Sequence, residues 1–483
     1  MVYIYDLFHQ KLMDMKTLYT FSLLLACSLA FSQSHYTEPT YPVRVFAGME
    51  YGEAVDFAGN TVTLSLDMYY PVGDSNCLRP LLVMIHGGAF LSGTRYDPEV
   101  VAICNEMASR GYNVASIDYR LGMLPAASYI PYVLCPFTGA NACIYAADKM
   151  EWERAAYRAM KDARGAIRFL KNRAALDSTD VSNVFVGGVS AGAITALYVG
   201  LLDEEAEKPA AAFQLPDGPV PDPDLMVCVP QPFSTERPDL GPVEGTLNLG
   251  QQDASVAGVA AFMGAVIDTT LLSGGTPPLY LYHRTDDLVV HCNWFPFFPL
   301  YWYCLDPTNS CQPNASRPFA AGSCFISNEL TSQGVPPGHL LADIVDQGFP
   351  GSWDCLDNPP GHSIANIPLR CQNLSNFLAP IIAASGNDPA ENCMVDPTGE
   401  TAQLEPISIF PNPLTGSVLQ YSNLPAGQPY TCSLLDLTGR PLAAFLTSGA
   451  PDGSIDLPPL APGIYYLRFS SDRESFVLKV VKG

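Results

Sequence analysis

One serine of the chain lies in a pattern that suits a nucleophile. Ser190 is the central residue of the G-V-S-A-G sequence at 188–192, which follows an apolar run at 184–186 and precedes an apolar helical run at 193–202. A strand, a G-x-S-x-G turn and a helix in this order leave the serine hydroxyl exposed at the end of the strand. The start of the helix adds N–H donors and a dipole that favour negative charge. The pattern therefore predicts acyl transfer by Ser190.

A second turn is suited to hold the negative charge that such a reaction creates. The sequence H-G-G-A-F at 86–90 follows the apolar run 81–85. Glycines let backbone N–H groups approach a ligand closely. We expect Gly87 and Gly88, together with the N–H of Ala191, to form an oxyanion hole. The alternative is a purely structural turn after a strand.

The elements that must position these two turns alternate along the chain. Apolar or alternating runs predict strands at 61–70, 81–85, 114–119 and 184–186, and stripes of helical period predict helices at 98–110 and 151–176. Strands that alternate with helices form a mostly parallel sheet. Each turn then follows a strand of one sheet, so the sheet is the scaffold of the site.

With these motifs the chain resembles the α/β-hydrolase family over about residues 41–380, and more narrowly the esterases and lipases with an HGG oxyanion motif and an S-A-G elbow. The resemblance also rests on the sequences at 119–122, 162–170 and 277–290. It implies an α/β class protein with the α/β-hydrolase fold and the chain order nucleophile, acid, histidine. Val189 stands where these relatives often have Glu or Asp, so one polar contact of theirs is absent here.

The family's acid comes from a loop after a late strand. The run 279–282 is such a strand, and the T-D-D-L-V-V sequence at 285–290 follows it. The family pattern H-G-T-x-D-x-x-V places the acid at Asp287, and Asp286 is the alternative. Arg284 replaces the usual glycine of the pattern, which leaves the geometry of the loop open.

The general base is found by elimination among the seven histidines of the chain. Only His339 and His362 follow the acid at a useful distance in the sequence. His362 lies in the P-G-H-S sequence at 360–363, just before a helical run, whereas His339 starts an apolar run that is typical of a structural element. We expect His362 to take the serine proton and to deliver it to the leaving alcohol, while Asp287 orients its ring.

The segment after the acid is rich in aromatic residues and proline. Seven of the ten residues 294–303 are aromatic, and the prolines exclude a regular core helix. The segment is either a cap over the substrate pocket or a packing cluster tied by disulfides of Cys292, Cys304 and Cys311. The insert at 124–150 is a second candidate for a pocket wall.

Composition narrows the classes of partner. The 483 residues include 48 acidic and 25 basic ones, a net charge of −23. This charge argues against nucleic acid and anionic membranes as partners. Residues 33–404 hold 40 acidic and 18 basic residues, so the acidity belongs to this segment and favours neutral esters over polyanions. We expect no cofactor and no metal site, since no C-x-x-C pair occurs.

The N-terminus reads as a secretory signal. Lys16 precedes a mainly apolar stretch at 18–31 and a cleavage-like A-F-S sequence at 30–32, so the natural start is Met15. A lipoprotein box at 24–27 is the alternative. No later apolar run reaches the roughly 18 residues of a membrane span, so we expect no transmembrane segment.

Export makes disulfides the expected state of the cysteines. Six of the 14 cysteines lie between Cys292 and Cys371, so this region is expected to be cross-linked. Removal of Cys27 with the signal leaves an odd number, which predicts at least one free thiol. The pairing cannot be deduced from the sequence.

The polar segment at 386–404 reads as a linker, and the sequence after it has a different pattern of apolar residues. Residues 407–483 have no helical stripe, and their short strand-like runs predict a small β-sandwich. The sequences at 407–413, 435–440, 460–467 and 479–483 closely resemble the C-terminal sorting domain of the type IX secretion system of Bacteroidota. The resemblance implies export across the outer membrane, with release or surface attachment, and the secretion machinery as a partner.

The sequence therefore predicts four segments: an N-terminal extension and signal at 1–32, an α/β-hydrolase catalytic domain at 33–392, a linker at 393–404 and an all-β sorting domain at 405–483. The predicted function is a secreted serine carboxylic-ester hydrolase for small-molecule or polymer esters. A peptidase of the same fold and a catalytically inactive surface-binding protein are the alternatives. The complete Ser, Asp and His set argues against the inactive protein, and the lack of a visible accessory domain argues against the peptidase.

Overall fold

The computed structural model describes residues 36–76, 78–125, 147–220, 234–273, 275–297, 318–347, 361–386, 407–414, 416–424, 429–436, 441–470 and 475–482. The predicted signal at 1–32, the linker at 393–404, most of the insert at 124–150 and the second half of the aromatic segment lie outside these ranges. Those predictions therefore stay predictions.

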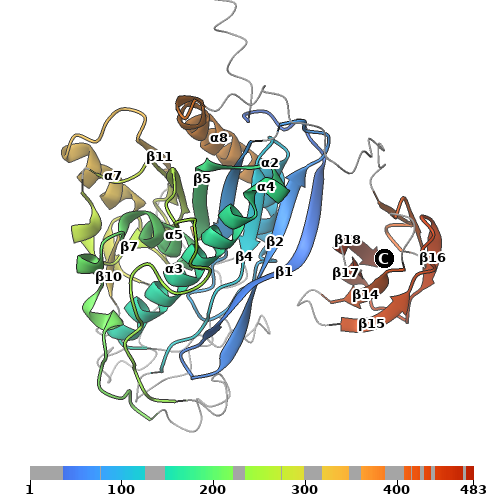
Figure 1. The fold of residues 1–483 in the computed structure, drawn as a ribbon, viewed down its shortest axis with the longest axis horizontal. Helices are drawn as coiled ribbons and strands as arrows, with labels where there is room; N and C mark the ends of the chain where they lie inside the picture. Colours follow the sequence, from blue (N-terminus) through green and yellow to red (C-terminus); the bar gives the residue numbers. More distant parts are fainter. Residues whose placement is uncertain are drawn as a thin grey trace, which may run out of the picture.

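An eight-stranded sheet forms the scaffold of the large unit (Figure 1). In spatial order its strands are β1 (Val43–Val55), β2 (Thr61–Pro71), β4 (Asn113–Ile117), β3 (Arg79–Ile85), β5 (Thr179–Val189), β6 (Gly258–Phe262), β8 (Leu279–Arg284) and β11 (Leu340–Val345). Strand β2 pairs in antiparallel fashion with both β1 and β4. Every later pair in this order, from β4–β3 to β8–β11, is parallel. This order and the covering helices confirm the predicted α/β-hydrolase fold with a mostly parallel sheet.

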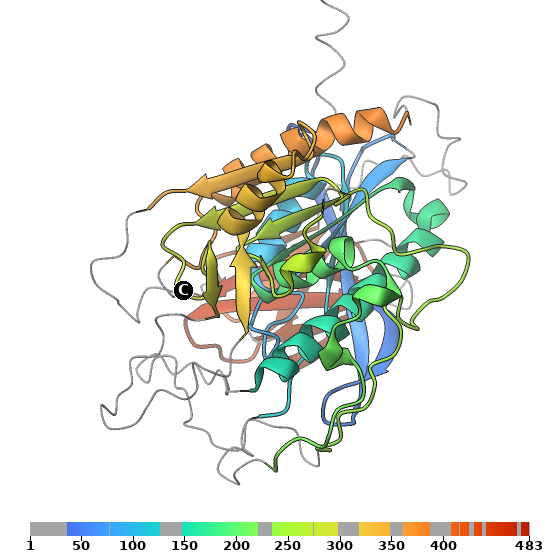
Figure 2. The same ribbon diagram turned by 90° about the vertical axis from the view of Figure 1, so that its left-hand side faces the viewer.

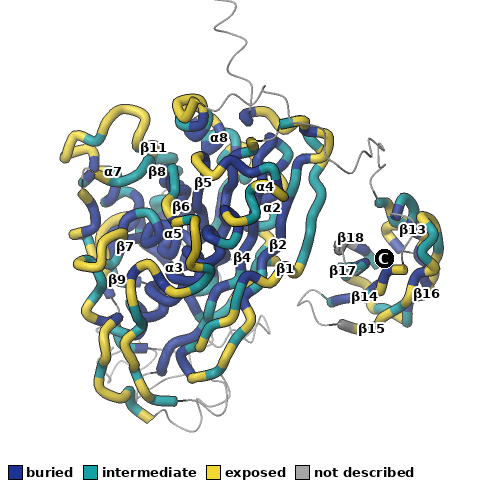
Figure 3. Tube along the Cα trace, in the orientation of Figure 1, coloured by how far each residue is buried: buried dark blue, intermediate teal, exposed yellow. Residues whose placement is uncertain are grey.

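Helices cover both faces of the sheet because its central strands are apolar on both sides. Along β3, Leu81, Val83 and Ile85 face one core, while Leu82 and Met84 face the other. Helices α3 (Lys149–Asn172) and α5 (Ala191–Leu201) pack on the first face, and α2 (Pro98–Ala108) and α8 (Ile367–Ala384) pack on the second. Figure 2 shows α8 in orange and α3 in teal on opposite sides of the strands, and Figure 3 shows the central strands as buried.

Helix α3 buries a polar face as well as an apolar one. Its predicted apolar stripe faces the sheet, but its basic side chains also lie inside the protein. The Arg154 guanidinium donates to the carbonyl of Pro238, Arg164 to that of Val243, and the Lys171 ammonium to that of Ser255. The segment 238–255 has no helix or strand of its own, and these charge-assisted hydrogen bonds hold it against the helix.

The remaining elements of this unit flank the sheet. A three-stranded sheet has the order β7 (Ala265–Val266), β10 (Phe319–Gly322) and β9 (Trp294–Pro296), and helix α7 (Ser323–Ser332) follows β10. Short helices are α4 (Ala174–Asp177), η1 (Glu205–Glu207), η2 (Ala210–Ala212) and η4 (Thr269–Leu271). Strand β9 covers the start of the aromatic segment, which agrees with the prediction that this segment is not a helix.

The C-terminal unit consists of two antiparallel sheets. One has the order β12 (Ser408–Phe410), β13 (Val418–Ser422), β16 (Gly453–Asp456), and the other β15 (Pro441–Leu446), β14 (Thr431–Leu435), β17 (Gly463–Ser470), β18 (Ser475–Lys482). Leu419 and Ile455 of the first sheet share one core with Leu434 and Leu467 of the second. This common core makes the unit the small β-sandwich that was predicted.

Among the helices in the described ranges, none has the length and apolar character that a membrane span requires.

Candidate active site

Ser190 lies in a strained turn between β5 and α5. Its backbone angles, φ 57° and ψ −120°, belong to a region that few non-glycine residues adopt, and such strain persists where the surrounding structure enforces it. The flanking glycines allow the turn. A Cβ at Gly188 would lie 2.2 Å from the carbonyl oxygen of Gly192, and one at Gly192 would lie 2.1 Å from that of Ile85. The turn therefore has no room for other residues at these two positions.

The structure brings the predicted nucleophile, base and acid into one hydrogen-bonded line. The hydroxyl of Ser190 lies 2.8 Å from Nε2 of His362, and Nδ1 of the same ring lies 2.8 Å from Oδ2 of Asp287. His362 is 172 residues from the serine and 75 from the aspartate in sequence. A side chain at Gly361 would clash with the carbonyl of Asp286 at 2.2 Å, so glycine is needed where the two loops meet.

The alternatives for acid and base lie elsewhere. The Asp286 carboxylate pairs with the Arg284 guanidinium at 2.8 Å, which is the residue that replaced the expected glycine. His339 is exposed, and its carbonyl accepts the N–H of Leu279 at the start of β8. Neither group contacts Ser190 in the described structure, so the geometry favours Asp287 and His362.

Electrostatics favour a charged Asp287 carboxylate and a protonated His362 ring. Burial alone would raise the pKa of Asp287, but the nearby His362 and the hydrogen bonds from His283 and His362 lower it to about 2. Burial would lower the pKa of His362, yet the charge and hydrogen bond of Asp287, with a further contribution from Glu99, raise it. A charged carboxylate beside the ring therefore stabilises the imidazolium that forms when His362 accepts a proton.

The predicted oxyanion donors lie next to the serine. Strands β3 and β5 are neighbours, and Ile85 pairs with Gly188, so both turns leave the sheet side by side. A Cβ at Gly87 would lie 3.1 Å from the Cβ of Ser190. Ala191 is the first residue of α5, and an N–H in this position has no acceptor within its own helix.

The oxyanion turn is itself strained and supported. Ala89 and Phe90 have φ values of 55° and 61°. Gly88, with φ 105°, approaches Ser92 so closely that a Cβ would lie 2.1 Å from its carbonyl oxygen. The His86 ring is buried and stacks on the Tyr119 ring, with 4.5 Å between the ring centroids. Its Nδ1 lies 2.8 Å from the carbonyl oxygen of Gly87. These contacts fix the turn in one conformation.

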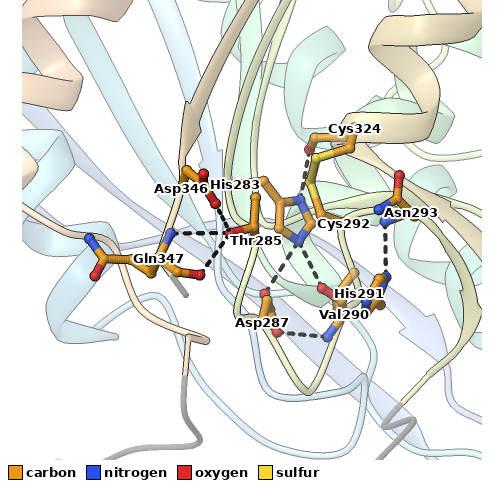
Figure 4. Close-up of a disulfide and its surroundings, with 11 residues drawn as sticks. His283, Thr285, Asp287, Val290, His291, Cys292, Asn293, Cys324, Asp346 and Gln347 are labelled. Carbon is orange, nitrogen blue, oxygen red and sulfur yellow. Dashed lines mark hydrogen bonds and ion pairs between the residues drawn. A yellow bond between two sulfur atoms is a disulfide. The ribbon is translucent and has the colours of Figure 1, made fainter. Parts of the chain in front are cut away.

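Three residues near the site were not identified from the sequence. His283 contacts Asp287 with Nε2 at 3.3 Å, as Figure 4 shows. Its Nδ1 contacts the hydroxyl of Ser323 at 2.8 Å. Glu99 of α2 accepts the backbone N–H of Ile364 at 2.9 Å. The spacing of four residues between His283 and Asp287 was a usable signal, but nothing in the sequence connects Glu99 or Ser323 with the site.

Part of the aromatic segment is exposed beside the acid loop. Trp294 and Phe295 are 39% and 45% exposed, and the Trp294 ring stacks at 5.8 Å on that of Phe319 from β10, which is 50% exposed. Phe297 is buried and packs against Trp152 at 5.3 Å. The described part of the segment thus combines an open aromatic surface with a packing contact, and the rest of it lies outside the described residues.

One disulfide is present in the described region, between Cys292 and Cys324, so Cys292 does not pair with Cys304 or Cys311. Those two cysteines lie outside the described residues. The free cysteines of the described ranges are buried: Cys104, Cys371 and Cys432. Within these ranges, no group of three or more His, Cys, Asp or Glu side chains is arranged to hold a metal ion.

Comparison with known sequences gives two matches. The sequence profile of the BD-FAE family matches residues 66–130, which include the H-G-G turn. The profile of the secretion system C-terminal sorting domain matches residues 408–483. No curated protein sequence matches the chain. The second match indicates type IX secretion to the cell surface or the extracellular space, as predicted.

Solved structures of esterases are similar to the chain at low identity. A thermophilic esterase of the Planctomycetes species Thermogutta terrifontis is 14% identical over 63% of this chain and 83% of its own, with a TM-score of 0.34. A truncated carbohydrate esterase from gut microbiota is 14% identical over 71% and 98%, with a TM-score of 0.39. A bifunctional GH43-CE protein of Bacteroides eggerthii is 16% identical over 68% and 35%, with a TM-score of 0.37.

The strand order and the two sequence matches lead to one assignment. The large unit has the α/β-hydrolase fold and is similar to the BD-FAE family over residues 66–130, and the chain carries a C-terminal sorting domain for secretion at residues 408–483.

Proposed function

We propose that the protein is a secreted serine hydrolase that cleaves carboxylic esters through an acyl-enzyme. The observation that carries this proposal is the line of two 2.8 Å contacts from the Ser190 hydroxyl through His362 to Asp287, which starts at a serine held in a strained turn. Nucleophile, base and orienting acid in this arrangement are the requirement for serine acyl transfer.

The first half of the reaction forms the acyl-enzyme. Oγ of Ser190 attacks the carbonyl carbon while Nε2 of His362 takes its proton, and the carbonyl π electrons move to the oxygen. The resulting oxyanion faces the N–H groups of the H-G-G turn, Gly87 and Gly88, and of Ala191. When the tetrahedral intermediate collapses, the bond to the alcohol oxygen breaks and His362 gives its proton to the leaving alcohol.

The second half releases the acid. A water molecule attacks the acyl carbon while His362 takes one of its protons. The bond to Oγ of Ser190 then breaks, and His362 returns the proton to the serine. Asp287 stays ionised throughout, because its pKa is lowered to about 2, and it stabilises the imidazolium in both halves.

The charge of the chain supports neutral substrates. Residues 33–404, which contain the whole site, have 40 acidic and 18 basic residues. Long-range repulsion from this surface disfavours polyanionic substrates. Neutral alkyl, aryl or polysaccharide esters are therefore the proposed substrate class.

The segments at 33–392 and 405–483 are proposed to act separately, the first as catalyst and the second as sorting domain. Sorting is expected to end with release or surface attachment, and residues 1–32 are proposed to direct the first export step. The separate hydrophobic cores of the two described units support this division.

Ser190→Ala tests the nucleophile directly. We expect the variant to lose hydrolysis of short p-nitrophenyl esters and labelling by a fluorophosphonate probe, with an unchanged unfolding temperature. Ser182→Ala, an exposed serine at the beginning of β5, is the matched control and should keep both. Esterase activity of Ser190→Ala at the wild-type rate would refute the proposal. An ester and peptide panel on the wild type separates esterase from peptidase.

A further inference from the structure

The ring of His283 is enclosed at the end of β8 and uses both nitrogens. It is 0% exposed. Nε2 lies 2.7 Å from the carbonyl oxygen of Val290 and 3.3 Å from Oδ2 of Asp287, and Nδ1 lies 2.8 Å from Oγ of Ser323. Figure 4 shows the ring between the acid loop on one side and Cys324 at the start of α7 on the other.

The partners of the ring define which nitrogen carries the proton. Val290 offers a carbonyl oxygen and Asp287 a carboxylate, and both are acceptors only, so Nε2 of His283 must donate. The Ser323 hydroxyl can donate, so Nδ1 is left to accept from it. The ring is therefore a fixed link from α7 to the carboxylate of Asp287.

The oxygen that His283 reaches is the one that holds the proposed base. Oδ2 of Asp287 receives Nδ1–H of His362 at 2.8 Å and faces Nε2–H of His283 at 3.3 Å. The other oxygen, Oδ1, accepts the backbone N–H groups of Val289 and Val290 at 2.8 and 3.0 Å. Both carboxylate oxygens are thus fixed, and His283 is the side chain that fixes the oxygen facing the base.

The disulfide joins the two segments that hold the ring. Val290 precedes Cys292 by two residues, and Ser323 directly precedes Cys324. The backbone N–H of Cys324 donates to the carbonyl of Cys292 at 2.8 Å. The disulfide thus adds a covalent bond to the backbone hydrogen bonds that hold the far end of the acid loop against the start of α7.

We propose that His283 is a positioning residue for Asp287 and that the Cys292–Cys324 disulfide holds the ring in place through Val290 and Ser323. This inference rests on the proposed function, because it assigns a purpose to a contact of the proposed acid. The purpose is orientation: a misplacement of about 1 Å in a catalytic group can reduce turnover roughly 10²-fold.

Two substitutions of His283 separate its contacts. His283→Gln can place an N–H near the position of Nε2, whereas His283→Asn reaches only the position of Nδ1. We expect kcat to fall about tenfold or less in the glutamine variant and roughly 10- to 100-fold in the asparagine variant, with KM changed less than threefold. Rates are expressed per active site, counted by complete fluorophosphonate labelling. Equal kcat per site in both variants and the wild type would overturn the proposal.

The pH profile distinguishes positioning from simple loss of stability. Among the described residues, the charged groups that face His362 are Asp287 on the acid loop and Glu99 on α2, and Asp287 in turn faces His283, Arg284 and His291. A loosened Asp287 supports the imidazolium less well, so the acid limb of kcat/KM should move to lower pH in His283→Asn. A purely structural role would lower the number of active sites and leave the limb in place.

Milder variants guard against misfolding. Ser323→Ala removes the partner of Nδ1, and the double variant Cys292→Ser/Cys324→Ser removes the cross-link; each should lower kcat per site about tenfold with the same shift of the limb. Ser332→Ala, on the exposed end of α7, is the control and should match the wild type. If both milder variants keep the wild-type kcat and the wild-type position of the acid limb of kcat/KM, the proposed role of the disulfide-held ring is contradicted.

A spectroscopic measurement separates this inference from the proposed function. Nitrogen-15 NMR of labelled histidine, assigned with His283→Gln, should show His283 with its proton on Nε2. A proton on Nδ1 alone would refute the inference even in an active enzyme. If the wild type hydrolyses no ester while the NMR signal is as expected, the proposed function fails and the ring geometry stands.

Discussion

The carboxylate of Glu99 accepts a hydrogen bond from the backbone N–H of Ile364 at 2.9 Å, and this bond connects helix α2 to the loop of His362. Ile364 follows the proposed base by two residues. The elbow residue before the serine, Val189, is apolar and has no carboxylate to offer this loop. Glu99 therefore provides a carboxylate to the histidine loop from a different element, and its charge contributes to the raised pKa of His362.

Two variants of Glu99 separate its charge from its hydrogen bond. Glu99→Gln keeps an acceptor for Ile364 but removes the charge, so the pKa of His362 should fall and the acid limb of kcat/KM should move to lower pH by roughly half a unit. Glu99→Ala also frees the loop and should lower kcat about tenfold. Glu106→Gln, on the same helix, is the control. An unmoved limb in Glu99→Gln would exclude the electrostatic part of this role.

The two adjacent aspartates make a matched pair for the acid. Asp287→Asn removes the carboxylate that faces His362 and should reduce kcat by about 10⁴, because the ring loses its orientation and its counter-charge. Asp286→Asn breaks only the partly exposed pair with Arg284 and should cost less than about tenfold. Steady-state kinetics on a p-nitrophenyl ester measure both. A larger loss in Asp286→Asn would reverse the assignment.

A second pair tests the base. His362→Ala removes the group that contacts the Ser190 hydroxyl, so kcat should fall by several orders of magnitude. His339→Ala changes an exposed residue before β11 and should leave kcat within about twofold. The comparison needs both variants at equal fractions of folded protein, checked by circular dichroism. Similar losses in the two variants would argue against His362.

The pH dependence of the wild type follows from the direction of the pKa shifts. His362 accepts a proton only when its ring is neutral, and its pKa is raised, so the acid limb of kcat/KM should lie above the ordinary histidine value of about 6.5. Asp287, with a pKa lowered to about 2, should add no limb between pH 4 and 8. Rates with an ester of a non-ionising alcohol, followed by pH-stat, test this. A limb near pH 5 would contradict a charged partner beside the base.

The turn around the proposed nucleophile and the proposed oxyanion turn could be located in the sequence because consecutive residues encode their geometry. Small residues at 188 and 192 make the elbow possible, and the strand and helix around it have clear periodicity. Asp287 and His362 come from separate loops, so the sequence left an alternative for each, and the choice required the contacts between the loops. His283, Ser323 and Glu99 act through single hydrogen bonds between distant segments, which no local pattern records.

The burial of the polar face of α3 and the pairing of Cys292 could not be predicted from the sequence, for different reasons. Basic side chains at helical spacing normally indicate a solvated face, yet here Arg164 and Lys171 are buried against backbone carbonyls of a segment without periodicity. Spacing could not show that this segment would cover the helix. The disulfide partner of Cys292 could not be predicted either, since 14 cysteines allow many pairings.

Deletion of residues 405–483 tests whether the C-terminal unit serves sorting alone. Its sandwich has a core of its own, with Tyr430 and Phe469 among the buried residues, and the proposed active site takes no residue from it. The truncated protein should therefore keep kcat/KM within about twofold but remain in the periplasm of a host with type IX secretion. Full-length Ser190→Ala, inactive but complete, is the control and should be exported normally. Export of the truncated protein at the wild-type level would refute the sorting role, and loss of its activity would show that the catalytic unit depends on the sandwich.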